Sequence, residues 1–209
     1  MNAKSRGRFI TFEGIDGAGK STQIALLVDA LRARGRGVLR TREPGGTELG
    51  EKLRELLLGM DMHPDTEAML MFAARREHLA VVIEPALATG AWVVSDRFSD
   101  ATHAYQVGGR GLAAARCDTL EAWTHPGFAP DLTFLFDISP ESAARRLAAA
   151  GTAPDRFECE QRDFFARVRA AYLDRARREP ARFRVLDATR KPEAIAAEIT
   201  ASIDEKTWP

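Results

Sequence analysis

Eight consecutive residues, Gly14 to Ser21, have the types and spacing of a loop that binds phosphate groups. They read GIDGAGKS and fit the pattern G-x-x-x-x-G-K-[ST]. The glycines let the backbone turn its N–H groups inward, because no Cβ blocks the approach. Lys20 can reach the β- and γ-phosphates, and the Ser21 hydroxyl can bind Mg²⁺. The sequence therefore predicts a nucleoside triphosphate site at this loop.

A second polar cluster, Asp96-Arg97, follows the apolar run that begins at Trp92. An aspartate at the carboxyl end of a buried strand can hold Mg²⁺ through water. Arg97 beside it suits a bidentate grip on a second phosphate group. The alternative interpretation is a surface ion pair.

Three further segments could contribute to the same site. TREPGGT (Thr41–Thr47) places an arginine and a carboxylate at a strand end, although it could be a plain strand-to-helix connection. In LMFAARREH, Phe72 and Arg76 are four residues apart and share a helix face, which suits stacking on a flat base and donation to its carbonyl. Aromatic side chains on helices are, however, more often core. Gly151–Glu158 carries glycine, proline and the central Arg156, which is plausible for a lid over the triphosphate or for an ordinary exposed turn.

The elements that position these clusters alternate along the chain, which predicts an α/β fold. Strands are expected at Arg8–Phe12, Gly37–Thr41, Ala91–Ser95, Leu132–Asp137 and Arg182–Leu186. Helices are expected at Lys20–Arg34, Glu48–Leu58, Asp65–Ala88, Leu112–Thr124, Pro140–Ala150, Gln161–Glu179 and Pro192–Asp204, with Pro85 kinking or shortening the third. The pattern predicts one domain over residues 1–209, a doubly wound, parallel, five-stranded sheet with helices on both faces and a small lid near 149–158. The carboxyl ends of the strands then bring the first three polar clusters to one rim.

Composition excludes several classes of protein. The chain has 209 residues, 30 basic against 30 acidic side chains and 45% hydrophobic residues, which are ordinary values for a globular protein without a basic field for nucleic acid. Cys117 and Cys159 are far apart and fit neither a disulfide framework nor a zinc motif, so both are expected to be reduced thiols. The amino end lacks a signal-peptide core, and no stretch approaches a membrane span, which favours a cytoplasmic location.

Taken together, five segments resemble bacterial thymidylate kinases of the phosphate-loop nucleoside monophosphate kinase family. They are FEGIDGAGKST, TREPGGT, LMFAARREH, VVSDRFSDATHAYQ and PDRFE, and the likeness runs from about Phe9 to Tyr172. The resemblance implies transfer of the γ-phosphoryl group of ATP to dTMP, giving dTDP for dTTP synthesis, with Mg²⁺ and as a homodimer. An apolar face over Leu70–Val82 could pair with its copy or belong to the monomer core.

The resemblance also implies roles for individual residues. ATP and its metal would be held by Gly14, Ile15, Asp16, Gly17, Ala18, Gly19, Lys20, Ser21 and Thr22, with Asp96 helping to place Mg²⁺. The substrate dTMP would be held by Asp16 at the 3′-hydroxyl, Arg97 at the phosphate, Phe72 and Arg76 at the base, Thr102 and Gln106 near the base edge, and Tyr105 against the sugar. Catalysis would fall to Lys20, Arg97, Asp16 and the lid residue Arg156.

Two positions depart from the family pattern. One branch carries an arginine inside the phosphate loop where this chain has Gly17, so the lid must supply that cation. Its candidates are Arg156 and, in reserve, Arg145 and Arg146. Phe98 stands where the family often has tyrosine or histidine, and this exchange is expected to alter packing alone.

The implied reaction is a direct in-line phosphoryl transfer, which needs positioning and positive charge more than covalent help. The dTMP phosphate is itself the nucleophile, so the four histidines are expected to be structural or exposed. Other readings remain: a phosphate-loop kinase acting on a deoxynucleoside or a different monophosphate, or a regulatory nucleotide-switch ATPase.

Overall fold

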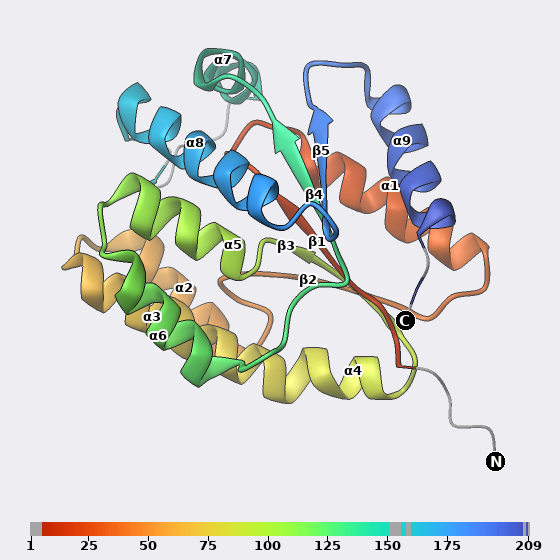
Figure 1. The fold of residues 1–209 in the computed structure, drawn as a ribbon, viewed down its shortest axis with the longest axis horizontal. Helices are drawn as coiled ribbons and strands as arrows, with labels where there is room; N and C mark the ends of the chain where they lie inside the picture. Colours follow the sequence, from red (N-terminus) through yellow and green to blue (C-terminus); the bar gives the residue numbers. More distant parts are fainter. Residues whose placement is uncertain (1–5, 151–155, 158–159, 207, 209) are drawn as a thin grey trace.

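A parallel sheet forms the centre of the structure, a computed structural model that describes residues 6–150, 156, 157, 160–206 and 208. Among these residues, five strands are arranged in the order β2-β3-β1-β4-β5, and every neighbouring pair is parallel. The strands are β1 (Phe9–Glu13), β2 (Val38–Arg42), β3 (Trp92–Asp96), β4 (Leu132–Asp137) and β5 (Phe183–Asp187). Helices lie on both faces of the sheet (Figure 1). The predicted doubly wound α/β fold is confirmed, with each strand beginning within one residue of its predicted start.

The helices follow the predicted alternation, except that the helical region Ser99–Gly109 was not predicted. They are α1 (Lys20–Ala33), α2 (Glu48–Gly59), α3 (Pro64–His78), η1 (Leu79–Ile83), α4 (Glu84–Ala88), α5 (Ser99–Thr102), η2 (His103–Gly109), α6 (Ala114–Thr124), α7 (Pro140–Ala150), α8 (Arg162–Arg178) and α9 (Pro192–Glu205). The segments η1 and η2 are π-helical. The helical turns of α5 and η2 were not among the predicted helices.

The long helix predicted over Asp65–Ala88 is divided by the π-helical segment η1. Pro85 lies in the first turn of α4, directly after this segment. Proline has no N–H and its ring crowds the carbonyl group four residues earlier, so a wider π turn accommodates it without ending the helix. Pro85 was predicted to kink or shorten this helix. In the structure the helix continues through Pro85 with a local change of pitch in η1.

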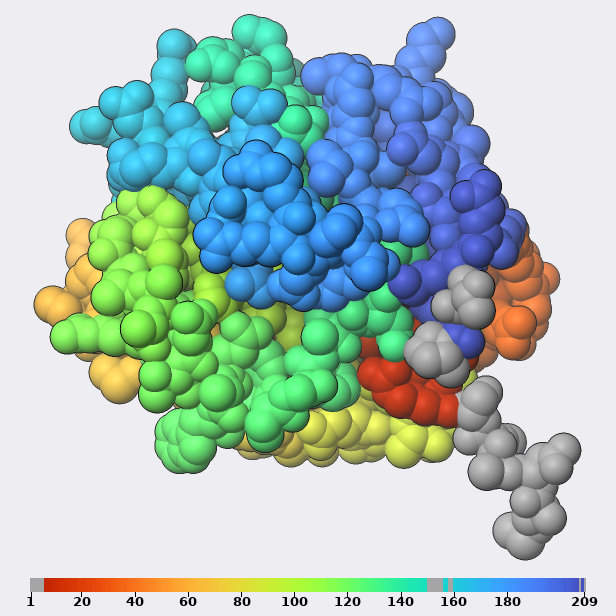
Figure 2. All heavy atoms as spheres, viewed as in Figure 1, coloured from red at the N-terminus to blue at the C-terminus, as the bar shows by residue number. Residues whose placement is uncertain are grey.

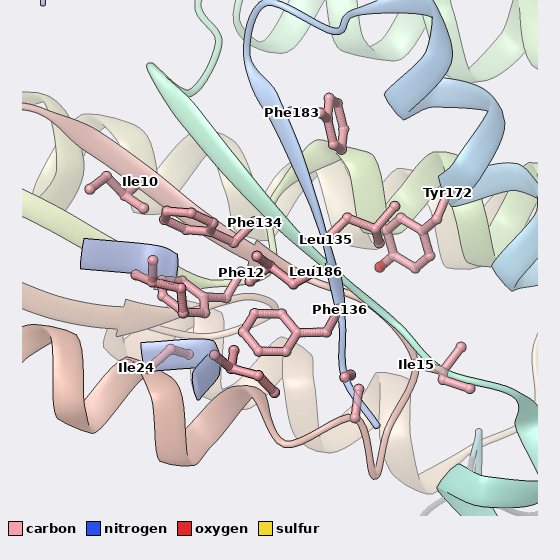
Figure 3. Packing of buried hydrophobic residues seen from close by; sticks show 14 of the residues in the cluster. Ile10, Phe12, Ile15, Ile24, Phe134, Leu135, Phe136, Tyr172, Phe183 and Leu186 are labelled. Carbon is pink, nitrogen blue, oxygen red and sulfur yellow. The ribbon is translucent and has the colours of Figure 1, made fainter. Parts of the chain in front are cut away.

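The core is divided between the two faces of the sheet because side chains alternate along each strand. On β1, Ile10 and Phe12 belong to the larger cluster with Ile24 of α1. The intervening Phe9 belongs to a smaller cluster with residues of η1 and α4. Figure 3 shows Phe12 and Phe136 between the sheet and α1, and Tyr172 reaching the sheet from α8. These helices fix the strands that carry the polar rim.

The parallel register brings the carboxyl ends of β1, β2 and β3 together. Asp96 is paired with Phe12 on one side and with Arg42 on the other. The segments that follow these strands therefore meet at one edge, as predicted. Of the predicted lid at 149–158, only the end of α7, Arg156 and Phe157 belong to the described residues; residues 151–155, 158 and 159 lie outside them.

Two smaller expectations concern the cysteines and the membrane-spanning helices. Cys117 is a buried free thiol, whereas Cys159 lies outside the described residues. In the part of the chain that the structure describes, no helix is both long and apolar enough to cross a membrane. In Figure 2, α6 and α8 lie on the near surface of the molecule.

Candidate active site

The loop between β1 and α1 is shaped by glycines in left-handed conformations. Gly14, Gly17 and Gly19 have φ angles of 130°, 79° and 92°, a region that other residues rarely adopt. Lys20 is buried, and its Nζ donates to the carbonyl oxygens of Gly14 and Ile15 at 3.1 and 3.2 Å. The loop thus curls around its own lysine, as in an anion-binding turn at a helix N-terminus.

Position 17 requires glycine for a second structural reason besides its φ angle. A Cβ placed on Gly17 would lie 2.5 Å from the carbonyl oxygen of Ala143 in α7. The backbone of α7 therefore leaves no room for a side chain at position 17. In this chain, the packing of α7 is therefore a structural reason for glycine at position 17, where some relatives have an arginine.

Arg97 connects the phosphate loop to the substrate side of the rim. It is the one non-glycine residue with a positive φ (72°) in the described part of the chain. Its Nη2 donates to Asp16 Oδ1 at 2.7 Å and to the Tyr105 hydroxyl at 2.9 Å, while Nη1 donates to the Tyr172 hydroxyl at 3.2 Å. Tyr105 also donates to Asp16 Oδ2 at 3.2 Å. A strained backbone whose side chain is bonded to three others indicates a site rather than a surface ion pair.

Glu13 holds the turn that gives Arg97 its conformation. Its Oε1 accepts the N–H of Phe98 at 2.7 Å, and Oε2 shares a hydrogen bond of 2.8 Å with the Tyr172 hydroxyl. Burial, together with the nearby Asp100 carboxylate, raises the pKa of Glu13 to about 8. Asp100 remains ionised because it is bound by two arginines, Arg175 and Arg182.

The charges around the loop compete with burial. Burial raises the pKa of Asp16, but Arg97 and Lys20 outweigh it and hold this pKa well below its usual range. Burial and the neighbouring Arg97 lower the pKa of Lys20. Asp16 is therefore a carboxylate between two cations, and the three side chains form a preorganised charged group.

A hollow with about 560 Å³ of empty space, part of it open solvent, lies beside Arg97. Its wall mixes charged groups with a few apolar side chains. They come from the phosphate loop, the loop after β2, α2, α3, the segment after β3, the end of α5, η2 and the lid segment. The lining residues are Asp16, Glu43, Pro44, Arg54, Leu58, Met71, Arg75, Arg97, Phe98, Ala101, Thr102, Tyr105, Gln106 and Phe157.

Arg75 is the buried donor at the far end of this hollow. Its Nε donates to Glu43 Oε2 at 2.7 Å and its Nη2 to Thr102 Oγ1 at 3.0 Å. Its Nη1 is buried and has no hydrogen-bond partner among the described residues. Glu43 is held in turn by His78 at 3.0 Å. A guanidinium fixed on two sides with one unpaired donor can bind a carbonyl acceptor of a ligand.

The structure corrects the predicted base contacts by one residue. Phe72 does not line the hollow but packs in a cluster with Leu112 and Cys117, and Arg76 turns outward to the Thr124 carbonyl at 3.0 Å. One residue along a helix is a rotation of about 100°, so the neighbouring positions face the site instead. The lining pair, Met71 and Arg75, has the same four-residue spacing.

The other predicted substrate residues lie at the hollow. Asp16, Arg97, Thr102, Tyr105 and Gln106 all line it. Thr102 accepts from Arg75, and Gln106 Nε2 donates to Glu67 Oε1 at 2.8 Å. The spacing of Thr102 and Gln106 therefore places both on one face of α5 and η2.

The candidate lid cations lie in different places. Arg156 donates to the Leu57 carbonyl at 2.9 Å and pairs with Glu67, on the α2–α3 side of the hollow. Arg145 is bonded to Ser142 at the surface. Arg146 lies nearest the phosphate loop, because its Nη1 would be 3.9 Å from a Cβ on Gly19.

A second hollow adjoins the outer side of the phosphate loop. Gly19 and Thr22 line it, together with Arg146, Arg190 and Pro192 from α7 and the segment before α9. Sequence reasoning did not assign the segment after β5 to a site, since no polar motif distinguishes it. Glu43, Arg75, Met71 and Tyr172 were also missed; of these, only Glu43 had a signal, as the carboxylate of TREPGGT.

Ser21 and Asp96 fit a hard divalent cation. Ser21 starts α1 beside Lys20 and is exposed. Asp96 Oδ1 is buried and has no hydrogen-bond partner within the described residues. Asp96 lies near enough to Lys20, the residue before Ser21, to act on its pKa. A carboxylate oxygen and a hydroxyl are donor types that suit Mg²⁺.

Comparisons with known proteins agree on one family. The family model described as Thymidylate kinase matches residues 12–199. The chain is 62% identical over 196 residues to a protein named Thymidylate kinase from Cupriavidus pinatubonensis, covering 93% of this chain and 96% of the relative. It is 59% identical to the protein of that name from Thiobacillus denitrificans, covering 96% and 98%. The crystal structure of thymidylate kinase from Ehrlichia chaffeensis superimposes with a TM-score of 0.78 at 33% identity, covering 95% of this chain and 99% of that one.

Proposed function

The chain belongs to the thymidylate kinase family, and from this membership we propose how its own residues divide the transfer of a phosphoryl group from ATP to dTMP. It is an ATP-dependent dTMP kinase that forms dTDP and ADP and so serves dTTP synthesis. The observation that carries the division of roles is the position of Arg97. Its guanidinium lies between the phosphate loop and the hollow, bonded to Asp16 of the loop and to Tyr105 of the wall.

ATP is assigned to the phosphate-loop side. Residues Gly14 to Thr22 bind its phosphates through inward N–H groups, and Lys20 exchanges its carbonyl partners for phosphate oxygens. The base and ribose would occupy the hollow next to Thr22, where Arg146 supplies a stacking or charged contact. Mg²⁺ would be held by Ser21 and through Asp96, and when bound it neutralises charge on the β- and γ-phosphates.

The dTMP molecule is assigned to the hollow beside Arg97. Arg97 binds the substrate phosphate, and Asp16 accepts from the sugar 3′-hydroxyl. The Tyr105 ring crowds the position of a ribose 2′-hydroxyl, and the unpaired Nη1 of Arg75 donates to a carbonyl oxygen of thymine. Met71 lies against the base face and Thr102 and Gln106 near its edge.

Chemistry in this site consists of positioning and charge neutralisation. The dTMP phosphate is already an anionic nucleophile near neutral pH, so no side chain has to remove a proton from it. Lys20 and Arg97 stabilise the charge that spreads over the transferring phosphoryl group. A lid closed over the bound nucleotides would exclude water, which would otherwise hydrolyse ATP without productive transfer.

A coupled assay tests these assignments directly. ADP release is followed with dTMP, with thymidine and without an acceptor, using wild type and Arg97→Ala. We expect release to depend on dTMP, and the variant to lose at least about a hundredfold in kcat/KM because the phosphate loses a bidentate partner. Turnover on thymidine rather than dTMP would indicate a deoxynucleoside kinase, and acceptor-independent hydrolysis would indicate a switch ATPase.

Arg156 is proposed to supply the lid cation, although it is bonded to Leu57 and Glu67 here. It must leave these partners to reach the transferring group. Replacing Arg156 by Ala should lower kcat by roughly 10³-fold, as for other arginine fingers, while the dissociation constant of ATP changes little. The matched variant is Arg146→Ala; a loss of kcat confined to that variant would assign the role to Arg146 instead.

We also propose that the enzyme is a cytoplasmic homodimer. Met69 and Val81, on or next to α3, are 51% and 57% exposed, although both side chains are apolar. Such side chains are compatible with a contact between two copies. Light scattering at several protein concentrations gives the mass, and a monomer at micromolar concentration would contradict the proposal. Cell fractionation tests the location.

A further inference from the structure

Four side chains with metal-binding atoms converge between η2 and α6, outside the phosphate loop and the substrate hollow. His103 lies at the start of η2, directly after the hollow-lining Thr102, and Asp118 and Glu121 are on α6. His125 is the residue that caps the end of α6. Neither the transfer reaction nor the proposed substrate contacts uses any of these groups.

The ligand atoms are close enough for one cation. His103 Nε2 lies 2.5 Å from Glu121 Oε2 and 3.9 Å from Asp118 Oδ1, and the three groups can place one atom each within 4.8 Å of one another. The other oxygen of Glu121 is 3.9 Å from His125 Nε2. Ligands about 2.0–2.1 Å from a tetrahedral zinc ion are roughly 3.3 Å apart, so shifts of less than about 1 Å bring each of the contacts at 2.5 and 3.9 Å to that separation, whereas His125 Nε2 also has to come closer to His103 and Asp118.

His125 provides an observation that is independent of the acidic groups. Its side chain is 1% exposed, and its Nδ1 lies 3.0 Å from the Phe128 carbonyl oxygen. A carbonyl only accepts, so Nδ1 carries the hydrogen and a neutral ring keeps its lone pair on Nε2. That Nε2 is buried and has no hydrogen-bond partner among the described residues. A histidine whose second nitrogen donates to a backbone carbonyl is the usual arrangement of a metal ligand.

The ring of His125 cannot easily turn away from the cluster. Its centroid is 5.1 Å from that of Phe98, and the Phe72 ring lies 6.4 Å away on a similar tilt. An unpaired nitrogen confined in this way has a desolvation cost that a cation would offset. This distinguishes the cluster from a chance group of exposed carboxylates.

We propose that His103, Asp118, Glu121 and His125 form a Zn²⁺ site. Two imidazoles and two carboxylates suit zinc, whereas Mg²⁺ and Ca²⁺ prefer oxygen ligands alone. The cation takes the place of the hydrogen between His103 Nε2 and Glu121 Oε2. In the neutral ring that hydrogen moves to Nδ1, so that Nε2 offers its lone pair to the metal. Asp118 is 65% exposed, so it provides the entrance from solvent. Because His103 adjoins Thr102, bound zinc fixes η2 against α6 at the wall of the substrate hollow.

Metal binding is measured on the full chain after removal of metals with a chelator and without nucleotide. Co²⁺ is titrated as a visible probe and Zn²⁺ by calorimetry. We expect one equivalent per chain, four-coordinate cobalt absorption, and displacement of Co²⁺ by Zn²⁺. Since no kinase activity is read, the outcome is separate from that of the proposed function. Failure to bind a stoichiometric equivalent would overturn the zinc site.

Two substitutions of exposed carboxylates form a matched pair. Asp118→Asn removes one ligand at the entrance, where little packing is lost, and should weaken zinc binding by at least about tenfold. Asp29→Asn removes an exposed carboxylate of α1, away from the cluster, and should leave the affinity unchanged. Equal affinity in wild type and Asp118→Asn would place the metal elsewhere and contradict the proposal.

An NMR spectrum of the histidine side-chain nitrogens tests the zinc site without substitution of buried residues. On addition of Zn²⁺, the Nε2 signals of His103 and His125 should shift, while those of His78, which is buried against Glu43, should not. If the cluster is only a hydrogen-bonded chain of imidazoles and carboxylates, neither signal moves, and the zinc site is refuted.

Discussion

At the scale of single residues, Arg75 shows how a binding group is prepared in advance. Glu43 and Thr102 each hold one side of its guanidinium, which leaves Nη1 buried and without a partner among the described residues. The Phe72 ring lies 4.8 Å below the same guanidinium. Phe72 therefore supports Arg75, which we propose as the base contact, although Phe72 does not line the hollow itself.

The neighbouring arginines offer a direct comparison. Arg75→Lys keeps the charge but loses the planar fork, and we expect KM for dTMP to rise by about tenfold to a hundredfold, as for a lost hydrogen bond to a charged group. Arg76→Lys alters an exposed pair and should leave KM within about twofold of wild type. Steady-state kinetics with both variants decide between the two positions; the opposite ranking would restore Arg76 as the base contact.

Glu43 is a positioning residue that acts through Arg75. Glu43→Gln keeps the shape but removes the charge that orients the guanidinium, so we expect KM for dTMP to rise with a smaller change in kcat. Unfolding in urea should also require about 1–3 kcal/mol less, because the pair is buried. Glu51→Gln, at an exposed carboxylate of the same loop region, is the control. A fall in kcat alone would show that Glu43 does not act on binding.

At the scale of elements, the site depends on how helices approach the sheet rim. The π segments η1 and η2 change the pitch of two helices close to the site. The helix α3 turns Met71 and Arg75, not Phe72 and Arg76, toward the hollow. Packing of a helix also restricts the phosphate loop. Because α7 lies against Gly17, the loop has room only for glycine at this position.

Gly17→Ala and Gly35→Ala separate backbone strain from this helix contact. Both glycines have a positive φ, 79° and 73°, so alanine costs about 1–2 kcal/mol at either position. A Cβ on Gly35 meets no atom within 4 Å, whereas on Gly17 it meets the Ala143 carbonyl at 2.5 Å. Urea unfolding should show a larger loss of stability for Gly17→Ala, by about 1–3 kcal/mol, and a higher KM for ATP. Equal losses would mean that α7 moves aside without cost.

At the scale of the whole molecule, buried charges tie the sheet, α8 and the substrate side together. Glu13 of β1 is linked to Tyr172 of α8, and Asp100 of α5 to Arg175 and Arg182. These contacts span most of the chain, so their protonation affects global stability. Asp100 keeps its charge through its arginines, while Glu13, without a direct cation, holds a proton.

The raised pKa of Glu13 predicts a pH dependence of stability. In the unfolded chain Glu13 titrates near its ordinary pKa, but in the folded protein it titrates near 8, so between these values the folded state binds more protons. Its contribution to stability is complete below pH 4.5 and is lost as the pH rises toward 8, on the order of a few kcal/mol.

Glu13→Gln isolates this contribution, because glutamine cannot titrate but still accepts the Phe98 N–H. Urea unfolding of both proteins at pH 5, 6, 7 and 8 gives the difference in free energy. We expect wild type to lose stability relative to the variant across this range. Parallel curves would show that Glu13 is ionised throughout.

The sequence alone determined the fold and the chemistry of the triphosphate side. The GIDGAGKS loop and the strand–helix alternation are local patterns, set by glycine conformations and by the spacing of apolar residues. The same local information placed Asp16 and Arg97 at the rim, whereas Thr102, Tyr105 and Gln106 were assigned from the family resemblance.

Only the tertiary structure decided which side chains of α3 face the substrate, because a four-residue spacing is identical for two neighbouring pairs and packing selects the rotation. It also decided the buried partnership of Glu43 with Arg75 and the approach of His103 and His125 to the two oxygens of Glu121. Glu43 and Arg75 are 32 positions apart in the sequence and the two histidines 22, and no local periodicity brings either pair together. Their proximity arises when helices from different parts of the chain pack against one edge of the sheet.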